Sequence, residues 1–488
     1  MASTKGITVK KNENFSEWFS QIVQKAELAD SRYGIKGFVV HRPWGFYLIK
    51  KIYQYLEEAI ENDGHEAFLF PMAVKAADLT KEEEHAGFTP DVFWITEAGT
   101  EKLEEKFALR PTGEAQIYPM YSLWFRSHKE LPFKGYQTRI PAFRNDSGTR
   151  PFIRGREFMF FESHDVFNTH AEALAQVKTD LKICNDVVQD LIKIPYLHFK
   201  RPQWDKFKGA NNTFTPDSIA PDGKRLQLAS THDLGQNFSK AYNISVRGAD
   251  GEMHNPYQTC FGPGIWRIMA ALIAIHGDDQ GLIIPFDMAP KQVVIVPVLI
   301  KGKEEKVLEA CMKIADTLGK AKIRYLLDDR DSSPGEKYNE WEMKGVPIRL
   351  EVGPREADAN QISMAIRDQD KREVISAEEL INVIQKESKA LDERIDERAK
   401  KYFSNNTRDA STIEEVKKIL LEHKGFIRIP FCCVDWDGES CADTLKAETA
   451  GGNVCGTLYP EEEKVEAGMK CAVCGKEAKH IVYVAKSY

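Results

Sequence analysis

The sequence lacks any apolar run long enough to span a bilayer; its most hydrophobic stretches, residues 268–275 and 293–300, have the length of core segments. Its first residues, MASTKGITVKKNENFSEWF, contain no apolar signal core. An excess of basic charge is also missing, since the formal net charge is −7. This balance argues against non-specific coating of nucleic acid but leaves room for a local basic surface. We therefore expect a cytoplasmic protein with no membrane partner.

Cysteine is scarce until the last part of the chain, where residues 404–488 hold six of the nine. The odd number and the clustering favour a metal site in a reducing compartment over a disulfide framework. The motif CAVCG at 471–475 is typical of half a zinc knuckle, and tetrahedral coordination requires a second pair. The simplest ligand set is Cys432, Cys441, Cys471 and Cys474. Cys433 and Cys455 are competing ligands, and a redox CxxC is the less favoured alternative.

A length of 488 residues predicts two to four domains. After PFDMAP at 285–290 the sequence alternates between strand and helix patterns, which predicts a small, largely parallel α/β domain. We expect an α/β and α+β multidomain protein with boundaries at 1–288, 289–403 and 404–488. The charged helix expected at 378–402 fits a solvated face.

The most informative stretch is YQTRIPAFRNDSGTRPFIRGREFMFFESHDVF at 136–167, which predicts an antiparallel hairpin. Alternation along its second arm would place on one face Arg154, Arg156, Phe158, Phe160, Glu162 and His164. The opposite face, with Ile153, Met159, Phe161 and Phe167, is typical of a core. Charges in such a row require a ligand or partner, so we interpret the first face as a binding floor. Its arginine end, with Arg144, suits phosphates, and its Glu162 and His164 end suits a small ammonium group.

Weaker signals lie on either side of this hairpin. Helices are expected at 14–29, 43–62 and 170–193, and a strand at 65–74. Pro71 within that strand predicts either a plain edge or contact with a second subunit. Thr112 and Glu114 fit a plain capping pair at the start of a helix.

Two further signals follow the hairpin in the chain. His232, beside Gln227 and Ser230, fits either a structural cluster or a site. Arg267 opens a very apolar helix against its dipole, so it needs a partner such as a base or a phosphate.

Taken together and in order, the motifs resemble those of class II aminoacyl-tRNA synthetases, and closely those of prolyl-tRNA synthetases of the archaeal and eukaryotic type. The resemblance covers essentially the whole chain. It rests on RPTGE (110–114), FRND with PFIRGREFMFFESH (143–164), THDLGQNFS (231–239), GPGIWR (262–267), WEMKGVPIRLEVGPRE (341–356) and the terminal KSY. It implies an antiparallel-sheet catalytic domain, an α/β anticodon-binding domain and a small C-terminal α+β zinc-binding domain.

The resemblance also implies roles for individual residues. ATP would bind to Arg144, Asp146, Arg154, Phe158, Gln227, Ser230 and Arg267, of which Arg144 and Arg267 would be catalytic. L-Proline would bind to Phe88, Thr112, Glu114, Arg144, Glu162, His164 and His232. The anticodon of tRNA(Pro) would face Glu342, Arg349 and Arg355. Pro71 would lie in a homodimer interface, with Mg²⁺ assisting at ATP and structural Zn²⁺ in the tail.

The sequence departs from the family pattern at four positions: Asp146 replaces the usual Glu, Gly113 a common Ser, Gly155 a common Thr and Phe160 a common Trp. Between residues 165 and 226 there is no room for the large editing insertion of bacterial relatives. We therefore expect no editing of mischarged alanine by such an insertion. We also expect proline activation with some side activation of alanine or cysteine, because apolar fit excludes smaller substrates poorly.

Two alternatives to this activity remain open from the sequence. The first is a catalytically silent relative that binds tRNA; the presence of Arg144, Arg154, Glu162 and Arg267 argues against it. The second is a seryl, threonyl or glycyl enzyme. The threonyl enzyme would require a catalytic zinc, and no cysteine–histidine group is evident on the predicted site face.

Overall fold

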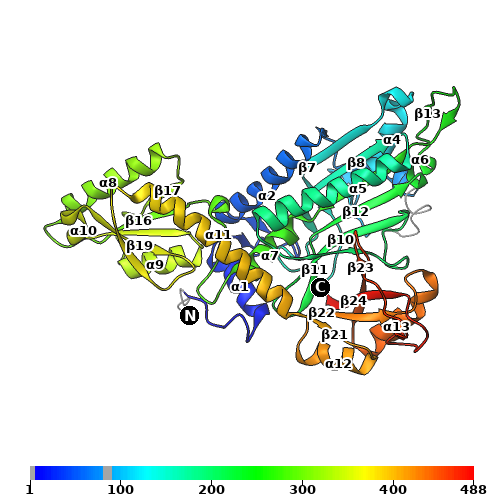
Figure 1. Cartoon of the computed structure of the whole chain (residues 1–488). Coiled ribbons are helices and arrows are strands. Elements are labelled where there is room, and N and C mark those ends of the chain that lie inside the picture. The colour runs from blue at the N-terminus through cyan, green and yellow to red at the C-terminus, as the bar shows by residue number, and fades with distance from the viewer. Residues whose placement is uncertain (1–5, 81–90) are drawn as a thin grey trace.

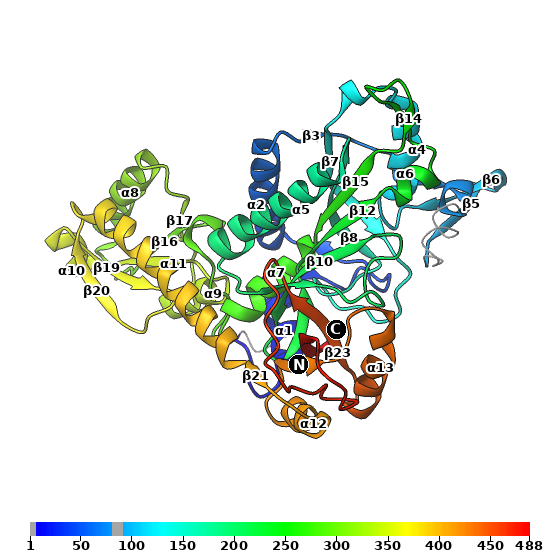
Figure 2. The same ribbon diagram turned by 45° about the vertical axis from the view of Figure 1, so that its right-hand side comes forward.

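The computed structural model describes residues 6–80 and 91–488. Twelve strands form one sheet in the order β21-β22-β24-β23-β9-β10-β12-β15-β8-β7-β3, with β11 beside β10 and β24 (Figures 1 and 2). Its catalytic strands are β3 (Glu66–Ala67), β7 (Phe133–Phe143), β8 (Glu157–Phe167), β9 (Leu197–Lys200), β10 (Asn212–Ile219), β11 (Lys224–Gln227), β12 (Ala229–Gly235) and β15 (Tyr257–Pro263). Neighbours from β9 to β7 are antiparallel, which confirms the predicted catalytic fold.

Four helices pack against this sheet and form the core behind it. They are α1 (Phe15–Lys25), α2 (Pro43–Asn62), α5 (His170–Cys184) and the apolar, almost fully buried α7 (Ile265–His276). The sequence predicted α2 at its exact bounds, because Pro43 starts it and Asn62-Asp63-Gly64 ends it. The helix predicted for 170–193 continues past α5 as a π-helical segment, Asn185–Leu191. Within the described residues, no helix is both long and apolar enough to cross a membrane.

Pro71 interrupts the segment that the sequence predicted as one strand. The segment forms β3, which lies at the edge of the large sheet, and β4 (Ala73–Lys75), which joins a second sheet. That sheet contains β5 (Trp94–Ala98) and β6 (Glu101–Leu109) and leads into α4 (Glu114–Trp124). The cap of α4 is Gly113 rather than the predicted Thr112, which makes no capping hydrogen bond.

The α/β domain has a five-stranded sheet in the order β17-β16-β18-β19-β20. Its elements are β16 (Val293–Pro297), α8 (Glu304–Lys320), β17 (Tyr325–Leu327), α9 (Pro334–Met343), β18 (Ile348–Val352), α10 (Pro354–Ala359), β19 (Gln361–Ile366) and β20 (Arg372–Ser376). The first three strands in the order are parallel, but β19 and β20 are antiparallel, so the expected largely parallel sheet is mixed. For β19 and β20 the reason is their short connection, which contains no helix, whereas a parallel connection would require one.

The tail is built onto the catalytic sheet. Its strands are β21 (Thr407–Asp409), β22 (Phe426–Phe431), β23 (Gly452–Leu458) and β24 (His480–Ser487), with helices α12 (Ile413–Glu422) and α13 (Glu439–Glu448). β23 pairs with β9, and β24 pairs with β11. Helix α11 (Leu380–Asn405) runs diagonally in Figure 1 from the α/β domain to the tail, and it buries six residues rather than only presenting a solvated face.

Two short strand pairs and one short helix lie in connections. They are β1 (Ala29–Asp30) with β2 (Val40–His41), β13 (Val246–Arg247) with β14 (Met253–His254), and the helix α6 (Asn237–Ala241), which follows β12. None of them carries a residue that the sequence singled out for a site.

Candidate active site

A cavity of about 330 Å³ lies on the sheet face formed by β8, β12 and β15 and ends at α7. Of the residues predicted for ATP and proline, it is lined by Thr112, Glu114, Arg144, Asp146, Arg154, Phe158, Glu162, Gln227, Ser230, His232 and Arg267. These residues come from segments more than 150 positions apart, and the antiparallel register of the sheet brings them together. Phe88 lies outside the described residues.

The arginine end is formed by the hairpin loop between β7 and β8. The backbone of Arg144 bonds to the carbonyl of Arg156 at 2.9 Å, which closes the loop, and the Arg144 side chain is exposed at the cavity. The Arg154 guanidinium lies 3.3 Å from Asp146. It also donates to the terminal oxygen of Tyr488 at 3.2 Å, so the end of the chain reaches this cavity. Arg156 differs from the prediction, because it turns away and donates to the carbonyl of Asp146.

Phe158 and Arg267 lie on opposite elements of the cavity wall, one on β8 and the other in the first turn of α7. Desolvation and the neighbouring Arg154 lower the pKa of Arg267 to about 10, so it stays charged at neutral pH. Gln227 on β11 is oriented by Arg201, which donates to its Oε1 at 3.3 Å. The Gln227 amide N–H groups then point to the cavity side and can donate to an oxygen of a ligand.

The opposite end of the cavity carries Thr112, Glu114 and His232. The Thr112 hydroxyl donates to the carboxylate of Glu114, which is buried at the start of α4. His232 contacts the hydroxyl of Thr213 through Nδ1 at 2.9 Å. Burial and the nearby His164 lower the pKa of His232 to about 3, so it is neutral at physiological pH.

Glu162 is the floor of this end, but its carboxylate is already occupied. Oε1 accepts from the buried guanidinium of Arg110 and from Gln137, and Oε2 lies 3.0 Å from His164 Nε2. Although burial opposes ionisation, Arg110 and His164 lower the pKa of Glu162 to about 2. His164 itself does not line the cavity; it lies behind Glu162 and contacts Tyr118 at 2.9 Å.

Two residues of this end were assigned no role from the sequence. Arg110 is fully buried and pairs with Glu162, whereas in the sequence it stood out only as part of the RPTGE motif. Cys260 lies opposite His164 in the β8–β15 register and lines the cavity. Its sulfur, a Glu114 oxygen and a His164 nitrogen lie within 4.8 Å of one another. The expectation that no cysteine–histidine group lies at the site is therefore wrong, because register pairs residues 96 positions apart.

Two of the family departures have a steric reason. A Cβ at position 113 would collide with the Glu162 carboxylate, and one at 155 would lie 2.5 Å from the Trp266 ring. Real Cβ atoms essentially never come this close to a neighbour. Glycine at 113 and 155 therefore lets the backbone approach the Glu162 and Trp266 side chains closely.

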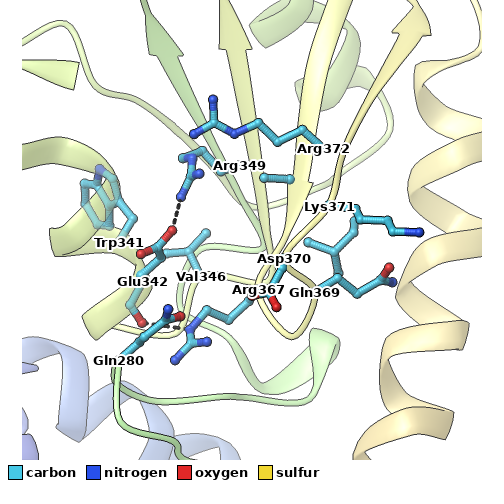
Figure 3. Close-up of a pocket in the computed structure, with 12 residues that line it drawn as sticks. Gln280, Trp341, Glu342, Val346, Arg349, Arg367, Gln369, Asp370, Lys371 and Arg372 are labelled. Atoms are coloured by element: carbon cyan, nitrogen blue, oxygen red, sulfur yellow. Dashed lines mark hydrogen bonds and ion pairs between the residues drawn. The ribbon is translucent and has the colours of Figure 1, made fainter. Parts of the chain in front are cut away.

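A second pocket lies in the α/β domain and is strongly polar (Figure 3). Two of the three predicted anticodon residues line it: Arg349 pairs with Glu342 at 2.7 Å. Arg355 lies on α10 and is not among its lining residues. The pocket instead gains Lys371 and the exposed Arg372, whose guanidinium pairs with Glu351 at 3.0 Å. Figure 3 shows Arg372 beside Arg349.

In the tail, the structure gathers the four predicted sulfurs of Cys432, Cys441, Cys471 and Cys474 within 4.8 Å of one another. The Cys432 and Cys441 sulfurs are 3.7 Å apart. Sulfurs bound to one tetrahedral zinc at 2.3 Å lie about 3.8 Å apart, so the donor set fits this ion. Neither Cys433 nor Cys455 belongs to the group, and Cys455 bonds to the carbonyl of Asn453.

An antiparallel sheet with arginines and an aromatic ring at one end of its cavity and buried carboxylates at the other defines a class II aminoacyl-tRNA synthetase. The family model "tRNA synthetase class II core domain (G, H, P, S and T)" matches residues 93–276, "Anticodon binding domain" matches 292–387, and "Prolyl-tRNA synthetase, C-terminal" matches 413–488.

Full-length relatives narrow the class. A proline--tRNA ligase of Thermofilum pendens is 48% identical, with 100% of both chains covered. One of Thermococcus kodakarensis is 39% identical over 98% of this chain and 99% of its own. The Giardia lamblia prolyl-tRNA synthetase in complex with prolyl-adenylate superposes with a TM-score of 0.94 at 35% identity, covering 99% of this chain and 100% of that one. The chain belongs to the prolyl-tRNA synthetase family, as the sequence motifs predicted, and is an ATP-dependent proline--tRNA ligase.

Proposed function

We propose that the cavity holds L-proline at its Glu114 end and ATP along Phe158 toward the arginines, and that the two react to prolyl-adenylate. The observation that carries the proposal is the opposite chemistry of the two ends of one cavity: guanidinium groups lie at one end, and Glu114, Thr112 and neutral His232 at the other. A Cryptosporidium parvum relative, 32% identical with a TM-score of 0.92, was solved with L-proline and AMP.

Glu114, rather than Glu162, is the carboxylate that we assign to the imino group of proline. Glu162 already accepts hydrogen bonds on both oxygens, whereas Glu114 is engaged only by Thr112 among the hydrogen bonds of the described residues. Glu162, fixed by Arg110, Gln137 and His164, then forms the rigid bottom of the proline pocket and contributes its negative charge to it. His164 acts through Glu162, and His232 closes the pocket from β12.

In the reaction the proline carboxylate attacks the α-phosphorus in line and pyrophosphate leaves. Arg144 bridges the carboxylate and the α-phosphate, and Arg267 faces Phe158 across the adenine; Arg154 contacts the outer phosphates. Fixed guanidinium groups stabilise developing charge without a general base. Asp146, Gln227 and Ser230 would orient adenine and ribose. Mg²⁺, held mainly by phosphate oxygens and water, would supply further charge neutralisation.

For the transfer step, tRNA(Pro) would place its anticodon in the second pocket, where Glu342, Arg349 and Arg372 face an open, polar cavity. Unstacked anticodon bases are read by such groups on their edges. Arg355 on α10 is exposed and would contact the same RNA from outside the pocket.

A pair of arginine variants separates the two sites. Arg144→Ala should abolish proline-dependent exchange between ATP and pyrophosphate, because the bridge between the two substrates is lost. Arg372→Ala should leave that exchange unchanged and raise the KM for tRNA(Pro). Thermal unfolding of both variants should match the unchanged enzyme, since both side chains are exposed. Wild-type exchange by Arg144→Ala would overturn the proposed site.

We also propose side activation of alanine or cysteine, with no editing domain between residues 165 and 226 to remove the products. The segment between residues 165 and 226 is filled by α5, the π-helical turn, β9 and β10, which belong to the catalytic fold. Pyrophosphate exchange with alanine or cysteine should exceed the background without amino acid. Exchange equal to background with both would show that the pocket excludes smaller substrates.

In the tail we propose a structural Zn²⁺ on Cys432, Cys441, Cys471 and Cys474, which would tie β22 to α13 and the 471–474 turn. The unpaired thiols fit the reducing cytoplasm.

A homodimer is proposed from the apolar surface around Pro71. There Leu69, Met72 and Leu123 are exposed by 82%, 43% and 61%.

A further inference from the structure

A second cluster of ligand-type side chains lies on the back of the catalytic sheet, away from the cavity. It consists of His65 after α2, Asp165 on β8 and Asp180 on α5, exposed by 4%, 0% and 0%. One ligand atom from each lies within 4.8 Å of the others. Two carboxylates and an imidazole in so dry a place require a compensating group.

In each of the three residues, one polar atom is held by a neighbour and the other has no hydrogen-bond partner. His65 Nδ1 lies 3.2 Å from the carbonyl of Ile60. Asp165 Oδ2 accepts from Thr259 at 3.2 Å, and Asp180 Oδ1 accepts from Gln176 at 2.9 Å. The atoms left over are His65 Nε2, Asp165 Oδ1 and Asp180 Oδ2.

This pattern is that of metal ligands oriented by outer hydrogen bonds, in which a histidine donates its other ring N–H to a carbonyl. His65 Nε2 and Asp165 Oδ1 are 3.2 Å apart without the alignment of a hydrogen bond. Nitrogen and oxygen ligands of one tetrahedral zinc, at 2.0–2.1 Å, lie about 3.3 Å apart. The nearby Lys134 does not neutralise the cluster directly, because its ammonium bonds to Asp63.

We infer that His65, Asp165 and Asp180 bind a divalent transition-metal cation, Zn²⁺ by its ligand preference, as a site separate from the tail cysteines. An imidazole among the ligands disfavours Mg²⁺ and Ca²⁺, which prefer oxygen alone. The ion would clamp α2 and α5 to β8 and β15. Asp165 directly follows His164 on β8, and Thr259 directly precedes Cys260 on β15, so the clamp lies under the amino-acid end of the cavity.

The competing explanation is a proton. Burial and the neighbouring Asp165 raise the pKa of Asp180 well above its usual range, so Asp180 could be neutral without an ion. The two explanations predict opposite effects of an amide at position 180.

Full-length enzyme is equilibrated with Zn²⁺, freed of loosely bound metal and measured for zinc per chain. The inference predicts two zinc ions in the unchanged protein and one in Asp180→Asn. Cys474→Ser is the matched control, which should also hold one, and the double variant should hold none. With zinc present, Asp180→Asn should unfold at a lower temperature than the unchanged protein; after chelation the difference should shrink.

Diffraction from the unchanged enzyme at the zinc absorption edge provides a measurement that needs no variant. An anomalous peak between His65, Asp165 and Asp180 would support the inference whatever happens at the cysteines. A peak at the cysteines alone would overturn it. So would Asp180→Asn with unchanged zinc content and undiminished stability, since asparagine replaces a protonated aspartate but not a metal ligand.

Discussion

At the scale of single residues, the site depends on the buried pair of Arg110 and Glu162. Replacing Arg110 by Met leaves an unpaired carboxylate under the cavity, and breaking a buried pair in this way costs about 3–5 kcal/mol. Arg110→Met should therefore lower the free energy of unfolding in denaturant by that order. Arg110→Met with Glu162→Gln should recover part of the loss, because the amide carries no charge. A single variant as stable as the unchanged protein would contradict the pairing.

The same pair predicts a dependence on pH. The pKa of Glu162 is about 2 in the folded protein and 4.5 for the ordinary group, so the unfolded chain takes up the proton first as pH falls. The stability that this carboxylate contributes is fully present above pH 4.5 and is lost as pH falls toward 2. The stability difference between the unchanged protein and Glu162→Gln should shrink across that window; a constant difference would show that the pKa of Glu162 is the same in the folded and the unfolded protein.

The site residues could be predicted where they belong to a sequence motif. They could not be predicted where only the pairing register of the strands brings them into the site. The lining of the cavity by Arg144, Phe158 and Arg267 follows from sequence motifs. Arg110 and Cys260 could not be found, because their partners lie on other strands and no local pattern records which residues face each other. The sequence predicted that His164 lies on the same face of the hairpin as Glu162. It did not show that His164 lies behind Glu162 and does not line the cavity.

At the scale of elements, hydrophobic periodicity and stop signals predicted α2, whereas the sequence did not show which strands pair with each other. Nothing in the tail's sequence indicates that β24 pairs with β11, since that pairing joins Lys224 to Lys486 across the chain. The tail therefore extends the catalytic sheet, and its last residue lies at the phosphate end of the cavity.

This pairing predicts a role for the end of the chain. Removing Tyr488 deletes the oxygen that accepts from Arg154 and the hydroxyl that donates to Asp222 at 2.7 Å. A lost hydrogen bond of about 0.5–1.5 kcal/mol corresponds to a roughly two- to tenfold rise in the KM for ATP. The KM for proline should not change, because the proline end is distant. Tyr488→Phe, which keeps the terminal oxygen, should have a smaller effect; an unaltered KM for ATP after deletion would contradict this role.

At the scale of the whole molecule, the proposed dimer surface is connected to the active site through a short chain of contacts. The exposed Leu69 and Met72 flank Pro71, and Trp124 of α4 packs on Phe68 and Phe70 beside them. The carbonyl of Met72 accepts from the backbone N–H of Arg110 at 2.9 Å. Arg110 in turn holds Glu162. A partner subunit that covers this surface would therefore stabilise the floor of the proline end.

Leu69→Lys should convert the dimer to a monomer, because it places a charge in an apolar interface, and sedimentation velocity would measure the change. Leu421→Lys is the matched control: Leu421 is exposed by 68% on α12, outside the proposed surface, and the variant should remain dimeric. The monomer should also show weaker proline-dependent pyrophosphate exchange, with the KM for proline raised more than that for ATP, since the contacts from Met72 lead to Glu162 rather than to the arginine end. Unaltered sedimentation of Leu69→Lys would remove this surface as the interface. A fully active monomer would show that the Arg110–Glu162 floor holds its geometry without a second subunit.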